Sequence, residues 1–148
     1  MEPKVPHVVV LVDHDPTAPE VVAAVRARAA RGPATYRVLL TNPAAHEAHL
    51  VHPERHDAAG ELVDRVPGIT AAMERAAGIE VVVDVSIRHE PYDALEEHML
   101  VHSTDEVIFS VARHRIAEKL HLDLGHRLQH LGVKVENAGA PSLPTTTA

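Results

Sequence analysis

The residues of this sequence that could do chemistry are mostly carboxylates and imidazoles, and the first group is Asp13, His14 and Asp15. These three residues directly follow an apolar run that predicts a strand. Two carboxylates beside an imidazole could act as acid–base groups or form the start of a metal site. A simpler role is also open, because Asp15 could cap a helix whose first residue is Pro16.

A second group of imidazoles lies between residues 41 and 57, a segment with two prolines and few large apolar side chains. Its four histidines are His46, His49, His52 and His56. They could ligate zinc or nickel if the segment folds so that the rings meet, with nearby carboxylates as further ligands. The alternative is an exposed loop of biased composition, since the spacing matches no recognised metal motif.

Two more histidine pairs are spaced four residues apart on predicted helices, His98 with His102 and His126 with His130. This spacing places both rings of a pair on one face of a helix. Two ligands alone make an incomplete metal site, so we expect these histidines to be surface or interface residues.

The elements that must position these groups follow from the apolar pattern. Short aliphatic runs predict strands at residues 7–12, 36–40, 79–85, 106–111 and 133–135. Helices are predicted between them at residues 20–30, 60–77, 92–101 and 116–131, and Pro67 should kink or split the second. Strands that alternate with helices pair in parallel through crossovers, which predicts an α/β fold with a doubly wound sheet.

Composition limits the class of protein. The chain has 148 residues, which suits one domain, and its net charge of −7 and three aromatic residues argue against nucleic-acid binding. No apolar run reaches the ~18–20 residues that a membrane span needs, and residues 1–6 lack the apolar core of a signal peptide. There is no cysteine for disulfides or thiolate chemistry. We therefore expect a cytoplasmic protein.

The order of elements, with Asp13 closing the first strand, resembles the universal stress protein family. The segment RHEPYDALEEHMLVHSTDEVIFSV is similar to the part of that family in which an acidic-Pro turn starts a helix before the fourth strand. The segment IAEKLHLDLGHRLQHLGVKV looks like the last helix and strand of small actinobacterial members. The resemblance covers residues 5–137. It implies a five-stranded parallel sheet of order 3-2-1-4-5 with helices on both faces, in a domain of residues 1–137. The tail at 138–148, which has two prolines and three threonines, should be disordered.

In such a sheet, ligands bind beyond the carboxyl ends of the strands where the strand order reverses. The resemblance places this crevice between the first and fourth strands, and the residues expected around it are Asp13, His14, Thr41, Ser110, Arg113 and Arg115. ATP-binding members of the family have a glycine-rich motif after the fourth strand, ending in Ser or Thr. The corresponding positions hold Ser110, Arg113, Asp123 and Leu124, so the glycines that admit phosphates and the hydroxyl are absent. The cofactor is therefore left unknown, with ATP or another nucleotide as one option.

The predicted function is a non-catalytic, universal-stress-protein-like module that binds a small ligand in this crevice and acts as a homodimer. The strand at Val133–Glu136 would form a sheet edge, and an exposed edge can pair with another chain. Two alternatives remain. One is a zinc- or nickel-binding protein that uses the histidine loop, and the other is a nucleotide-hydrolysing enzyme that uses Asp13 and Ser110, although no Gly-x-Ser-x-Gly elbow is present.

Overall fold

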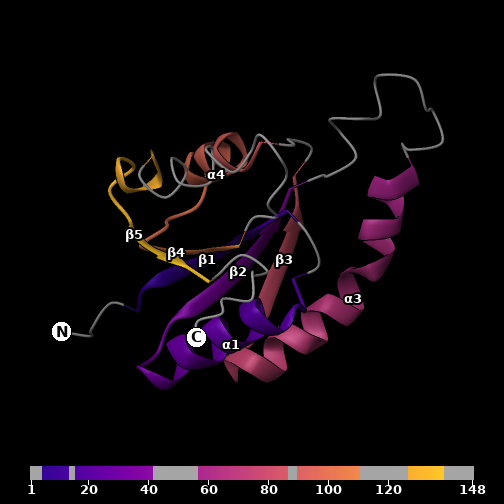
Figure 1. The fold of residues 1–148 in the computed structure, drawn as a ribbon, viewed down its shortest axis with the longest axis horizontal. Coiled ribbons are helices and arrows are strands. Elements are labelled where there is room, and N and C mark those ends of the chain that lie inside the picture. The colour runs from indigo at the N-terminus through magenta and orange to yellow at the C-terminus, as the bar shows by residue number, and fades with distance from the viewer. Residues whose placement is uncertain (1–4, 14–15, 42–56, 87–89, 111–126, 139–148) are drawn as a thin grey trace, which may run out of the picture.

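The protein is described here from a computed structural model, which covers residues 5–13, 16–41, 57–86, 90–110 and 127–138, apart from the side chains of 57–63. Its strands are β1 (His7–Val12), β2 (Thr35–Leu40), β3 (Val81–Val85), β4 (Glu106–Ser110) and β5 (Lys134–Asn137). They form one sheet of order β3-β2-β1-β4-β5, in which every pair of neighbours is parallel (Figure 1). The predicted fold class and strand order are confirmed.

The helices are α1 (Pro19–Ala30), α3 (Asp57–Ala77) and α4 (Pro91–Met99), and residues 127–129 are also helical. Val8, Val10 and Val12 of β1 pack in a core cluster with side chains from α1 and α3. Val9 and Leu11 pack in a second cluster with side chains from α4. Because successive strand residues point to opposite faces, α1 and α3 cover one face of the sheet and α4 covers the other (Figure 1).

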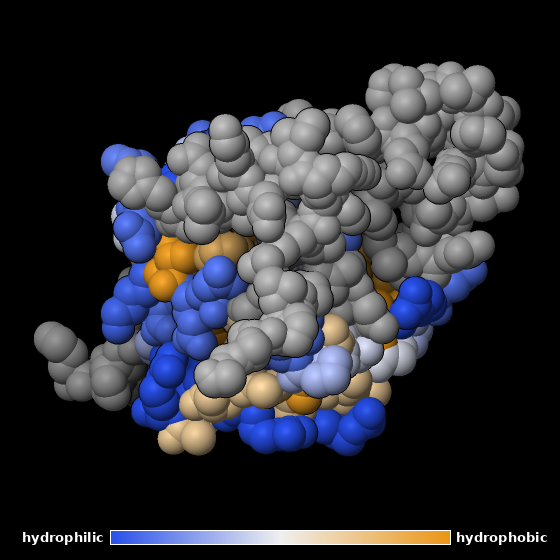
Figure 2. Space-filling model, in the orientation of Figure 1, coloured by the Kyte–Doolittle hydropathy of each residue, from blue (hydrophilic) through white to orange (hydrophobic). Residues whose placement is uncertain are grey.

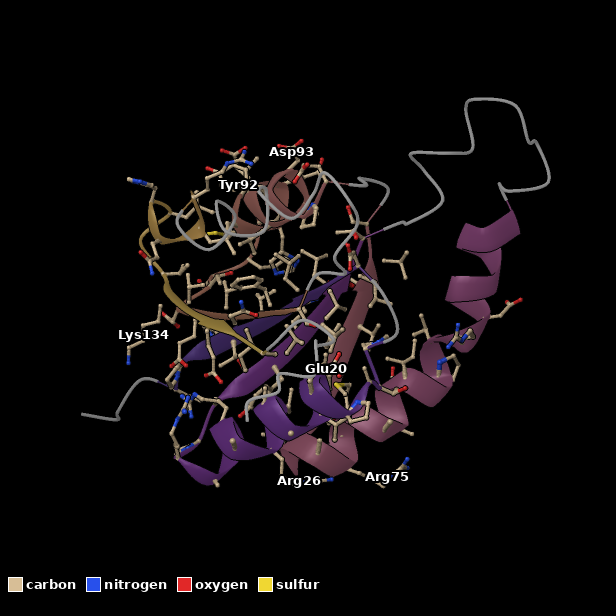
Figure 3. All side chains as sticks on the ribbon, viewed as in Figure 1. Glu20, Arg26, Arg75, Tyr92, Asp93 and Lys134 are labelled. Carbon is tan, nitrogen blue, oxygen red and sulfur yellow. The ribbon has the colours of Figure 1, made fainter. Side chains whose placement is uncertain are left out.

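Several charged side chains of these helices point outward, although Arg28 of α1 is buried. Arg26 of α1 and Arg75 of α3 project from one side of the molecule, and Asp93 of α4 projects from the opposite side (Figure 3). On the side seen in Figure 2, hydrophilic residues alternate with moderately hydrophobic ones along α1 and α3. The side chains of Arg26, Arg75 and Asp93 therefore lie on the sides of the helices that face away from the sheet.

The α1 helix starts one residue before the predicted range of 20–30, and the option of Pro16 as its first residue is wrong. The helix begins at Pro19, three residues after Pro16, and its N-cap is Ala18, which has no capping side-chain hydrogen bond. Pro19 suits the first turn as well as Pro16 would. Backbone N–H groups in the first turn have no partner within the helix, so nothing is lost when proline lacks one. The proposed cap by Asp15 lies outside the described residues.

Pro67 lies inside α3, which stays one helix and changes direction along its length (Figure 1). A proline removes one backbone donor and bends a helix, so the predicted kink is seen and the predicted split is not. The helix ends before Gly78, whose φ of 74° is a left-handed conformation that glycine adopts without strain.

An ion pair joins α1 to β4. The Nε and Nη2 atoms of Arg28 donate to the two carboxylate oxygens of Glu106 at 2.8 and 3.0 Å. Arg28 is buried and the Glu106 side chain is only 16% exposed. The hydrogen bonds from Arg28 lower the pKa of Glu106, and burial of the carboxylate opposes this only in part. The pair therefore remains charged inside the fold.

The strand predicted at Val133–Glu136 is β5, displaced by one residue and located at one edge of the sheet. It pairs with β4 alone, while β3 forms the other edge. The predicted tail lies outside the described residues from residue 139 onward. Within the part of the chain that the structure describes, no helix has the length and apolar character to cross a membrane.

Candidate functional site

The sheet brings three of the predicted ligand residues together at the carboxyl ends of neighbouring strands. In the register of the sheet, Val12 of β1 lies between Leu40 of β2 and Ser110 of β4. Asp13 and Thr41 are the residues that follow β1 and β2, and the Thr41 amide donates to the Val12 carbonyl at 3.0 Å. Asp13, Thr41 and Ser110 therefore lie where three strands end at the reversal of strand order, which is the usual ligand position in such sheets.

Thr41 is the unusual member of this group. It is 1% exposed, and its hydroxyl oxygen has no hydrogen-bond partner among the described residues. A buried hydroxyl without a partner costs about 1–3 kcal/mol. Ser110 is equally buried, and both Ser110 and Asp13 take part in further polar interactions. The residue that follows β2 thus has a buried hydroxyl that could still form a hydrogen bond with a ligand.

The other predicted site residues cannot be placed. His14, Arg113 and Arg115 lie outside the described residues. Asp123, which stands where the family's motif has a glycine, lies outside them as well. The histidine loop with His46, His49, His52 and His56 also lies outside them. Their proposed roles in ligand and metal binding stay predictions.

A second polar site lies on the α4 face, around a pocket of about 570 Å³. The pocket is lined by the first residues of β1 and β2, by residues near the start of β3, and by His98 and His102 at the end of α4. Asp84 of β3 joins these two histidines: one ligand-type atom from each of the three residues lies within 4.8 Å of the others. The sequence pattern gave the pair His98 and His102, but it gave no sign of Asp84.

The two imidazoles are held by local helix geometry. The His102 amide donates to the His98 carbonyl at 3.0 Å, so the helical spacing continues past the end of α4. The rings stack with centroids 4.6 Å apart and planes 28° apart. His98 is 7% exposed, and its buried Nε2 atom has no hydrogen-bond partner among the described residues.

The charges around His98 act mainly against its protonation. Burial lowers the pKa of His98, and the neighbouring His102 and Arg37 lower it further, while Asp84 acts in the opposite direction. The effect of Asp84 is limited because Arg37 Nη1 donates to Asp84 Oδ2 at 2.8 Å and balances its charge. The His98 ring is therefore neutral near pH 7.

No family model matches this chain, and no curated protein sequence matches it either. The resemblance to universal stress proteins consequently stays a prediction. The strand order agrees with that resemblance, but a fold of this type hosts many unrelated functions.

Proposed function

We propose that the protein is a non-catalytic, universal-stress-protein-like module of the cytoplasm that binds a small polar ligand at the carboxyl ends of β1, β2 and β4. The observation that carries this proposal is the buried hydroxyl of Thr41, which has no hydrogen-bond partner among the described residues and lies near Asp13 and Ser110 at the reversal of strand order. A ligand that hydrogen-bonds to this hydroxyl would remove the cost of leaving it unpaired.

The class of ligand follows from the side chains present. A carboxylate and two hydroxyls suit the hydroxyl and amide groups of a nucleoside or sugar. The positions that correspond to the phosphate-binding glycines hold Ser110, Arg113 and Asp123, so a triphosphate is a poor match in the sequence. We therefore rank nucleosides and monophosphates above ATP.

Homodimer formation through β5 is the second part of the proposal. β5 is an edge strand whose outer side has no neighbour in the described sheet, and its residues are only partly buried or exposed. An unpaired edge is a template for a strand of a second copy. Sedimentation velocity across a concentration series measures this directly, and a monomer at all concentrations would remove the dimer from the proposal.

The ligand proposal is tested by thermal shift with adenosine, AMP and ATP on the full chain. A ligand at 100 times its dissociation constant stabilises the folded state by about 2.7 kcal/mol. The variant Thr41→Val should lose the shift. Thr35→Val is the matched control, because Thr35 begins β2 at the opposite end and its hydroxyl bonds to His7 Nδ1 at 2.7 Å. Equal shifts in wild type and Thr41→Val, or no shift with any of the three probes, would reject the proposed site. Release of phosphate from ATP would instead favour the enzyme alternative.

A further inference from the structure

Asp84, His98 and His102 come from three places in the chain that the fold brings together on the α4 face. Asp84 lies in β3 opposite Leu39 of β2, and the histidines lie at and just beyond the end of α4. The proposed ligand site uses β1, β2 and β4, so the two sites share no side chain. The cluster is therefore separate from the proposed ligand site.

The geometry of the cluster suits a metal ion. One ligand-type atom from each residue lies within 4.8 Å of the other two. Bonds of about 2.0–2.2 Å to a tetrahedral ion bring ligand atoms to roughly 3.4 Å from one another. Side-chain rotation is enough to shorten the separation of the ligand atoms from up to 4.8 Å to this value. His102 is more accessible than His98 and has room to move.

His98 supplies an independent observation. Its Nε2 atom is buried, and no described residue donates to it or accepts from it. A polar atom in this position carries a cost that a metal bond would remove. The hydrogen bond from Arg37 uses only Oδ2 of the Asp84 carboxylate, so Oδ1 is not engaged by Arg37.

We infer that Asp84, His98 and His102 form a binding site for a divalent transition metal ion, with Zn²⁺ as the ion that best matches two imidazoles and one carboxylate. Mg²⁺ and Ca²⁺ prefer oxygen ligands and are poor matches. Three protein ligands leave one coordination position of a tetrahedral ion for water or a small ligand. That position would adjoin a pocket whose lining includes the apolar side chains of Ile79, Val82 and Val101.

The experiment measures Zn²⁺ binding to the chelator-treated full chain by competition with a chromophoric chelator. The test variants are Asp84→Asn and His102→Ala, which leave the buried His98 in place and keep the core packed. His130→Ala is the matched control, since it removes one histidine of the other pair spaced by four. We expect both test variants to lose one Zn²⁺ equivalent or at least about tenfold in affinity, and His130→Ala to match wild type.

Two further measurements separate this site from the histidine loop. The first uses a loop variant in which four histidines are changed to alanine: His46, His49, His52 and His56. This variant should still bind the one Zn²⁺ equivalent that His102→Ala loses. Co²⁺ in place of Zn²⁺ should give visible d–d absorption that the loop variant keeps and Asp84→Asn loses. The inference is overturned if Asp84→Asn and His102→Ala bind Zn²⁺ as wild type does, or if the loop variant loses all binding.

Discussion

Arg37 and Asp84 lie on the neighbouring strands β2 and β3, and Arg37 Nη1 donates to Asp84 Oδ2 at 2.8 Å. Both side chains are partly exposed, at 29% and 39%, so the ion pair itself contributes about 0–1 kcal/mol to stability. Its larger effect is on the cluster with His98 and His102, because it places a positive charge beside the proposed metal site.

Arg37→Gln should therefore tighten Zn²⁺ binding by about three- to tenfold, since like charges near each other repel even in a partly solvated site. Chelator competition measures the change. Arg31→Gln is the control, because Arg31 forms a similar exposed ion pair, 3.4 Å from Glu136, away from the cluster. Unchanged or weaker binding in Arg37→Gln would show that Arg37 mainly orients Asp84.

The buried ion pair between α1 and β4 should matter far more for stability. Glu106→Gln leaves the Arg28 guanidinium buried without a compensating charge, and we expect a loss of about 2–4 kcal/mol in the free energy of unfolding. Glu136→Gln, in the exposed pair with Arg31, should change it by less than about 0.5 kcal/mol. Urea denaturation at pH 7 measures both variants. Equal losses of stability in Glu106→Gln and Glu136→Gln would contradict a special role of the buried pair.

The same pair predicts the response to acid. The pKa of Glu106 is lowered in the folded state by Arg28, with smaller contributions from Lys134 and Arg31, so the unfolded state takes up the proton first. The stabilisation is complete above the ordinary glutamate pKa of about 4.5 and is lost as the pH falls through the lower folded pKa. Urea denaturation between pH 6 and 3 should show a steeper loss in wild type than in Glu106→Gln. If the free energy of unfolding fell equally with pH in both proteins, the lowered pKa of Glu106 would not contribute to acid sensitivity.

Thr41→Val should leave stability unchanged or raise it by about 1 kcal/mol, because it replaces a buried hydroxyl that has no described partner with a methyl group of similar size. Thr35→Val removes a hydroxyl that has a partner, the His7 ring, and should not be stabilising. Thermal unfolding without ligand compares them. A loss above about 1 kcal/mol for Thr41→Val would mean that the hydroxyl is bonded in the folded protein.

The sequence was sufficient for β1 because burial on both faces leaves a continuous aliphatic run at residues 8–12. It was less accurate for β3, which begins two residues after its predicted start and is mostly only partly buried. It was less reliable for the first residue of α1, where Pro16 and Pro19 are equivalent local signals and the helix begins at the second. The pair His98 and His102 was visible as a helical spacing. Asp84 was not, because its position beside them depends on the tertiary fold that brings β3 near the end of α4, which no local pattern encodes.

The order of the strands has a consequence for synthesis. Among the strands that the structure describes, β5 comes last in the sequence, and it covers the outer edge of β4. β4 holds Val107, Ile108 and Phe109, each at most 4% exposed in the finished fold. Until residues 134–137 have left the ribosome, this short apolar strand has an open side, and incomplete chains should be prone to aggregate through it.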